Sequence, residues 1–86
     1  NDAYGLLKKV NPSKLAARQK SLYALLFARA ATKTNRPNEA IQVLEQQIRA
    51  EPRNARLHQA LGVAYNDAGN DGKAFKAFAK AFQLDP

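Results

Sequence analysis

The chain has 86 residues, no cysteine and a net charge of +7. This length suits one small domain, and a chain without cysteine has neither disulfide bonds nor thiolate zinc sites to stabilise it. Good helix formers (alanine, leucine, lysine, arginine and glutamine) dominate the composition, which predicts an all-α fold.

Helical periodicity and the residues that interrupt it predict four helices. The first runs from Ser13, which can cap a helix N-terminus, to about Thr34. Asn35 follows it and can take the left-handed conformation that ends helices. After a short break that contains Pro37, the second helix spans roughly residues 38–50.

The third and fourth helices are delimited in the same way. Pro52 stops the second helix, and Asn54 caps a third that extends to about Ala68. Gly69 ends the third helix, because glycine tolerates a positive φ. Residues 71–72 then lead into the fourth. The apolar stripe of the fourth helix consists of Ala74, Phe75, Phe78 and Phe82.

An internal repeat relates the two halves of the chain. The short segments that end at Pro52 and at Pro86 have similar sequences. Aligning the chain with itself so that these two prolines coincide reveals the repeat. The same shift pairs residues of matching size, namely Ala40 with Ala74, Leu44 with Phe78, Ile48 with Phe82, Phe27 with Leu61 and Ala28 with Gly62. The period is that of a helix–turn–helix unit, which indicates stacked helical hairpins.

These spaced residues resemble the tetratricopeptide repeat (TPR). Over residues 55–86 the pattern of the family matches at Leu61, Gly62, Tyr65, Ala74, Phe78, Ala81 and Pro86. Residues 21–54 match it less closely. The resemblance implies an all-α, right-handed solenoid of antiparallel helical hairpins. Small residues such as Ala28 and Gly62 would let the helices approach closely, and large ones such as Phe78 would fill the space between hairpins.

The whole chain is expected to form a single TPR-type domain. Residues 1–12 would be the tail of a preceding helix, residues 13–54 a first hairpin and residues 55–86 a second. The interval from Pro12 to Pro52 is longer than the one from Pro52 to Pro86, so the first helix of the first hairpin is expected to be lengthened. We expect the chain to be a fragment of a longer bacterial protein. Its sequence is compatible with the cytoplasm and with the periplasm.

The resemblance also implies a binding site, because the first helix of each TPR hairpin lines a concave groove. The residues expected to bind a partner there are Leu22, Leu25, Arg29, Lys33, Arg56, Gln59, Val63 and Asn66. Thr32 and Asp67 are expected on the same faces of these two helices. Their apolar, amide and cationic groups suit an extended, acidic peptide or partner protein. Family members that grip a C-terminal carboxylate have lysine and asparagine where this chain has Leu25 and Arg29, so that mode is not expected.

No catalytic set can be assembled, and we expect neither an enzyme nor a metal or cofactor site. His58 is the single histidine, has no cysteine to pair with, and is expected to be an interface residue. The sequence from Gly69 to Gly72 lacks the P-loop lysine and the acidic ligands of a calcium loop, so it is expected to be a turn.

Other functions remain open. The chain could be the non-catalytic TPR tail of a larger enzyme, such as a bacterial envelope zinc peptidase, or a self-associating module that forms homo-oligomers. Eight basic residues and no acidic residue lie between Lys8 and Arg36, which indicates an acidic partner or a solvated positive face. Nucleic acid is disfavoured, because these cations fall on several faces of one helix with few aromatic residues between them. No apolar run is long enough to span a bilayer.

Overall fold

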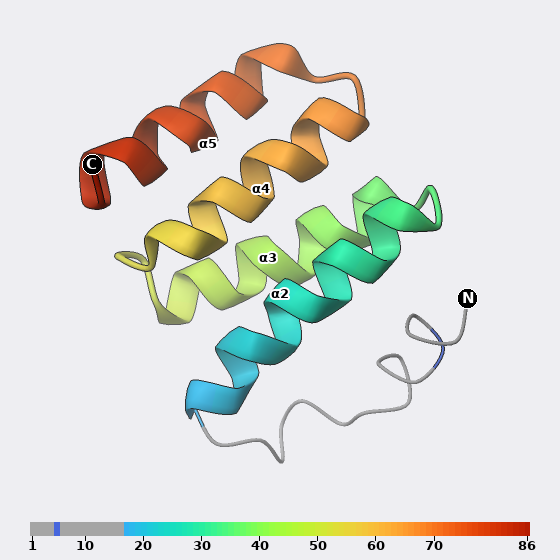
Figure 1. The fold of residues 1–86 in the computed structure, drawn as a ribbon, viewed down its shortest axis with the longest axis horizontal. Coiled ribbons are helices and arrows are strands. Elements are labelled where there is room, and N and C mark those ends of the chain that lie inside the picture. The colour runs from blue at the N-terminus through green and yellow to red at the C-terminus, as the bar shows by residue number, and fades with distance from the viewer. Residues whose placement is uncertain (1–4, 6–16) are drawn as a thin grey trace.

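The computed structural model describes residue 5 and residues 17–86, and this part of the chain contains four α-helices and no strand (Figure 1). The helices are α2 (Ala17–Lys33), α3 (Pro37–Ala50), α4 (Ala55–Asp67) and α5 (Asp71–Leu84). The prediction of an all-α chain is therefore confirmed for the described residues. Apart from residue 5, the predicted helix tail over residues 1–12 lies outside them, as does the predicted helix start at Ser13.

Consecutive helices run in opposite directions and pack side by side (Figure 1). The packed pairs are α2 with α3, α3 with α4, and α4 with α5. In addition, α2 contacts α4, which runs in the same direction as α2 (Figure 1). This last contact brings together two helices that are not neighbours in the sequence, and it forms the site described below.

Two helices end and one begins at the residues that the sequence predicted, and the local backbone conformation and hydrogen bonding explain why. Asn35 has φ 62° after α2, and Gly69 has φ 82° after α4. The side chain of Asn54 accepts a hydrogen bond from the backbone N–H of Arg56 at 3.1 Å, which satisfies one of the free donors at the start of α4. The predicted helix ends at these positions are confirmed.

Two helix starts differ from the prediction. Pro37 belongs to the first turn of α3 instead of the preceding break, because a proline at that position loses no helical hydrogen bond. Asn70 is the cap of α5 and accepts a hydrogen bond from the backbone N–H of Lys73 at 3.2 Å. Asp71 is therefore the first residue of α5 and lies where a carboxylate favours the helix dipole.

The core lies mainly between α2, α3 and α4, with Ala77 added from α5, and it is built largely from alanine. Its two largest fully buried side chains are Leu44 on α3 and Leu57 on α4, and both are 0% exposed. The small residues expected to allow close helix approach are all buried, namely Ala28, Ala40, Gly62 and Ala74. At Gly62 the approach is closest, because a Cβ there would lie 2.8 Å from carbons of the Phe78 ring.

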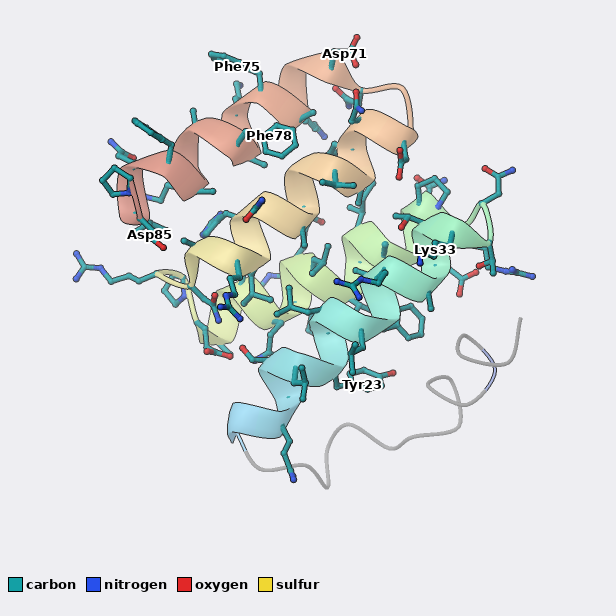
Figure 2. The ribbon with its side chains drawn as sticks, in the orientation of Figure 1. Tyr23, Lys33, Asp71, Phe75, Phe78 and Asp85 are labelled. Carbon is teal, nitrogen blue, oxygen red and sulfur yellow. The ribbon has the colours of Figure 1, made fainter. Side chains whose placement is uncertain are left out.

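The predicted apolar stripe of α5 is divided between two environments. Ala74 and Ala77 are buried, and Phe78 points toward α4 while remaining 39% exposed (Figure 2). Phe75 points away from the body of the molecule (Figure 2) and is 74% exposed. Phe82 is 68% exposed. The prediction that Phe78 fills the space between hairpins is thus met only in part, since no described helix covers its outer side.

A polar cluster ties the start of α2 to the connection between α3 and α4. The Glu51 carboxylate accepts hydrogen bonds from the hydroxyl of Ser21 and from Nε2 of Gln47, the latter at 2.6 Å. Nδ2 of Asn54 lies 3.1 Å from Oγ of Ser21 and 3.4 Å from Oε1 of Glu51. The Ser21 and Gln47 hydrogen bonds lower the pKa of Glu51 below its usual value of 4.5.

This lowered pKa predicts acid sensitivity that depends on Glu51. The unfolded state takes up the proton at a higher pH than the folded state, so the stabilisation is present above 4.5 and is lost as the pH falls through the lowered pKa. We expect Glu51→Gln to lower the free energy of unfolding at neutral pH, and we expect the difference from the parent chain to shrink in acid. Urea denaturation across this pH range measures both quantities.

The control for this prediction is Asp67→Asn, which removes an exposed carboxylate on α4. That variant should keep the acid dependence of the parent chain. If Glu51→Gln retained it as well, another carboxylate would be responsible for the acid response.

Candidate functional site

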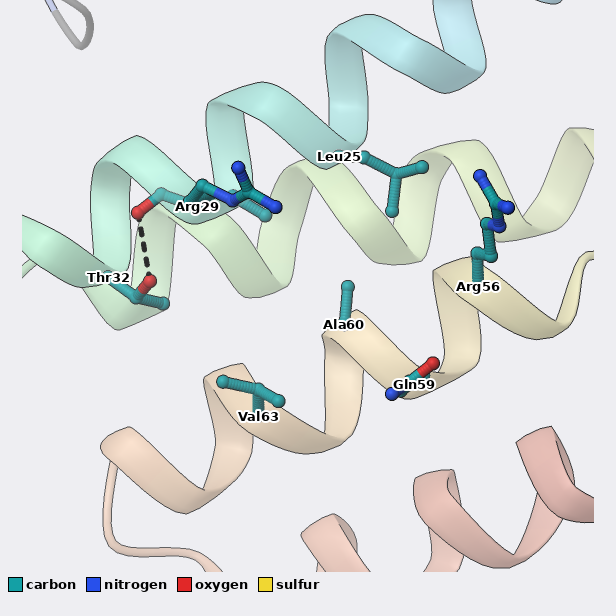
Figure 3. Close-up of a pocket in the computed structure, with 8 residues that line it drawn as sticks. Leu25, Arg29, Thr32, Arg56, Gln59, Ala60 and Val63 are labelled. Carbon is teal, nitrogen blue, oxygen red and sulfur yellow. Dashed lines mark hydrogen bonds between the residues drawn. The ribbon is translucent and has the colours of Figure 1, made fainter.

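A groove of about 410 Å³ lies between α2 and α4 (Figure 3). Its lining residues are Leu25, Ala28, Arg29 and Thr32 from α2, and Arg56, Gln59, Ala60 and Val63 from α4. Both helices also pack against α3, which holds them in position beside each other. The groove therefore depends on the three-helix arrangement and not on any one helix.

Helical spacing places these side chains on one face of each helix. On α2, Leu25, Arg29 and Thr32 follow one another at intervals of four and three residues, and such residues share a helix face. On α4, Arg56 and Val63 are seven residues apart, so they lie two turns from each other on the same face. Each wall of the groove is thus a short stripe of side chains along a helix.

The groove combines apolar side chains with two arginines and contains no acidic residue. Leu25, Ala60 and Val63 supply apolar surface, and Val63 is 43% exposed. Arg29 and Arg56 are exposed, and neither guanidinium forms an ion pair with a carboxylate of the described residues. The groove is therefore positively charged, with donors available to an incoming anionic group.

The Thr32 hydroxyl is less available to a ligand than the two arginine side chains are. Its hydroxyl donates a hydrogen bond to the backbone carbonyl of Arg29 at 3.0 Å (Figure 3). Because the Thr32 hydroxyl already donates its hydrogen to the backbone, Thr32 contributes to the shape of the groove more than to its hydrogen bonding. The free polar groups of the site are accordingly the two arginines and the amide of Gln59.

The structure brings five of the predicted site residues together, namely Leu25, Arg29, Arg56, Gln59 and Val63. Leu22, Lys33 and Asn66 do not line the groove and lie exposed on the same two helices. Lys33 directly follows Thr32, and neighbouring residues on a helix point in directions about 100° apart. Ala28 and Ala60 line the groove but were not among the predicted site residues, although their helical spacing from Leu25 and Val63 would have revealed them.

Other polar contacts near the helices have structural explanations. Nε2 of His58 lies 2.9 Å from the carbonyl oxygen of Pro52, and the side chain is half-buried. The hydroxyl of Tyr65 donates a hydrogen bond to Glu45, and this bond, followed by burial, raises the pKa of Tyr65 to about 12. Nζ of Lys73 lies 5.5 Å from the centroid of the same ring.

Over residue 5 and residues 17–86, no group of histidine, aspartate and glutamate side chains is arranged to hold a metal ion. The four helices of the same region also lack the combination of length and hydrophobicity that crossing a membrane would require.

Comparison with known proteins identifies one family. The model of the bacterial transcriptional activator domain (BTAD) matches residues 8–84. No curated protein and no solved structure gives a significant match. The family match covers nearly the whole chain and all four described helices, from Ala17 to Leu84. The chain therefore belongs to the bacterial transcriptional activator domain family.

Proposed function

We propose that this chain is a non-catalytic protein-interaction module of a bacterial transcriptional activator, with its helical hairpins arranged as in TPR proteins. The groove between α2 and α4 would hold an extended, acidic segment of a partner protein. The observation that carries the proposal is the position of Arg29 and Arg56 on opposite walls of a groove with apolar surface, neither of them paired with a described carboxylate.

The chemistry of the two arginines supports an acidic ligand. A guanidinium presents several N–H donors in a planar fork and binds a carboxylate through two parallel hydrogen bonds. Because Arg29 is on α2 and Arg56 is on α4, a segment that lies in the groove can reach both. Carboxylates in such a segment would replace the water that surrounds the two cations.

The apolar part of the groove supports a protein ligand over DNA. Contacts with phosphates require clustered cations only, whereas Leu25, Ala60 and Val63 offer surface that a phosphate backbone cannot use. Leucine or similar side chains between the acidic residues of a peptide would cover this surface. The family assignment supports a regulatory role for the complex, because the family is described as a domain of transcriptional activators.

The test is charge reversal on both walls. A labelled, extended peptide of leucine and aspartate residues serves as the probe, and fluorescence anisotropy measures its binding. We expect Arg29→Glu combined with Arg56→Glu to weaken binding by about tenfold or more, since each change replaces an attraction by a repulsion. Raising the salt concentration should weaken binding to the parent chain and have less effect on the variant.

A matched control reverses the same amount of charge elsewhere. Arg49 and Arg53 are exposed and line none of the groove, so Arg49→Glu combined with Arg53→Glu should bind the probe nearly as well as the parent chain. A peptide with asparagine in place of aspartate should bind weakly to all three proteins. If the two double variants lost equal amounts of affinity for the peptide, net charge and not this groove would be responsible for binding.

A short DNA duplex provides a further comparison. If the parent chain bound the duplex more tightly than the acidic peptide, the proposal of a protein ligand would be wrong. The circular dichroism spectrum of each variant should match that of the parent chain, because all four substituted side chains are exposed.

A further inference from the structure

The outer face of α5 carries an apolar surface that the groove does not use. A hollow of about 380 Å³ lies on this face, lined by Phe75, Lys76, Ala79, Lys80, Phe82 and Gln83. Phe75 and Phe82 are the two most exposed large apolar side chains of the described residues, at 74% and 68%. They lie seven residues apart, which places them two turns apart along the same face of the helix. Contiguous exposed apolar surface is typical of interaction sites.

The molecule itself shows what covers such a face. The internal repeat relates the outer face of α5 to the corresponding face of α3, and pairs Ile41 with Phe75 and Ile48 with Phe82. On α3, which packs against both α2 and α4, Ile41 and Ile48 pack against the core. No described helix covers α5 in the same way. A helix is therefore the element whose shape fits this face.

The charge at the edge of the hollow determines what kind of helix fits. Lys76 and Lys80 line the hollow beside the phenylalanines, and both are exposed. Neither forms an ion pair with a carboxylate of the described residues. A helix that buried the phenylalanines would place its own flanking residues next to these ammonium groups. Acidic residues at that flank would be attracted, and basic residues would be repelled.

We infer that the outer face of α5 is a second docking surface, which binds an amphipathic helix of a partner protein with an apolar stripe and acidic residues along one edge. The apolar stripe would pack on Phe75 and Phe82, and the acidic edge would pair with Lys76 and Lys80. This surface is separate from the α2–α4 groove, and the inference does not depend on the proposed function of the groove.

The charges argue against a second copy of the chain as the occupant. Antiparallel pairing of two α5 helices that brings Phe75 near Phe82 of the other copy also brings Lys76 near Lys80 and Asp71 near Asp85 of that copy. Both of these approaches join like charges. Packing of α5 against α2 of another copy is no better, because the sequence of α2 contains basic residues and no acidic residue.

The experiment uses a designed helical peptide of about 18 residues, five helical turns, with a leucine stripe flanked by glutamate. Its binding to the 86-residue chain is measured by fluorescence anisotropy, and amide chemical shifts locate the site. We expect Phe75→Ser combined with Phe82→Ser to weaken binding by about tenfold or more, because two exposed aromatic anchors are lost. Since both side chains are already exposed, the double variant should remain folded.

A charge exchange separates this surface from non-specific attraction. Lys76→Glu combined with Lys80→Glu should weaken binding of the glutamate peptide and strengthen binding of a matched peptide with lysine in place of glutamate. The groove variant Arg29→Glu with Arg56→Glu should bind the glutamate peptide nearly as well as the parent chain. This last result distinguishes failure of the groove proposal from failure of the present one.

Four outcomes would overturn the inference. They are chemical-shift changes confined to the α2–α4 groove, binding unaffected by loss of the two phenylalanines, absence of binding, and concentration-dependent dimers that the phenylalanine variant abolishes. A short DNA duplex that binds through Lys76 and Lys80, and that is insensitive to loss of the phenylalanines, would assign the surface to nucleic acid instead.

Discussion

Leu44→Ala is expected to lower the free energy of unfolding by about 2–5 kcal/mol. Leu44 lies on α3, is 0% exposed, and belongs to the core that α2, α3 and α4 share. The substitution removes buried methyl groups and leaves a cavity that the surrounding helices fill only in part. For a domain of this size, such a loss is a large fraction of the total stability. Urea denaturation followed by circular dichroism measures it.

Leu22→Ala is the matched control, because it makes the same chemical change on an exposed helix surface. Leu22 is 56% exposed on α2, and we expect the free energy of unfolding to change by about 0.5 kcal/mol or less. Similar losses in the two variants would mean that the helices do not pack around Leu44 as described. Leu57→Ala offers an independent check from α4, since Leu57 is also 0% exposed.

Gly62→Ala is expected to destabilise the chain, although alanine is the better helix former. A Cβ at position 62 would lie 2.8 Å from carbons of the Phe78 ring, so α5 must move away from α4 or the ring must rotate. Such overpacking costs about 1–3 kcal/mol, which over most of this range exceeds the gain in helix propensity of about 1 kcal/mol. Thermal and urea denaturation should both show a less stable protein.

A double-mutant cycle identifies the cause. When Phe78→Ala has removed the ring, Gly62→Ala should become stabilising by up to about 1 kcal/mol, because only the propensity gain remains. Gly72→Ala in the first turn of α5 makes the same change where the nearest neighbour, Oδ1 of Asn70, is 4.0 Å away, so it should not destabilise. If Gly62→Ala were equally destabilising with and without Phe78, contact with that ring would not be the reason.

Three of the helix limits could be predicted from the sequence because they depend on local chemistry. Asn35 and Gly69 adopt a positive φ without help from distant residues, and the Asn54 side chain reaches a backbone N–H only two residues ahead. The groove was partly predictable for a similar reason. Helical spacing and the resemblance to TPR proteins placed Leu25 and Arg29 on the same helix face.

The boundaries of the groove could not be predicted in this way. Whether Leu22, Lys33 or Asn66 reaches it depends on how α2 and α4 are rotated and shifted relative to each other, and packing against α3 sets that arrangement. The role of Glu51 could not be predicted from the sequence either, because its hydrogen bond with Ser21 joins residues 30 positions apart. No local pattern marks such a partner.

The sequence alone determined that this chain is helical, where its described helices end and which faces of them are apolar, since these properties arise from residues within one or two helical turns. Only the tertiary structure decided what each apolar face contacts. Leu44 and Phe78 occupy equivalent places in the internal repeat, yet Leu44 is fully buried and Phe78 is 39% exposed. The physical reason is that burial depends on the neighbouring helix: α4 covers α3, and among the described residues no helix covers the outer face of α5.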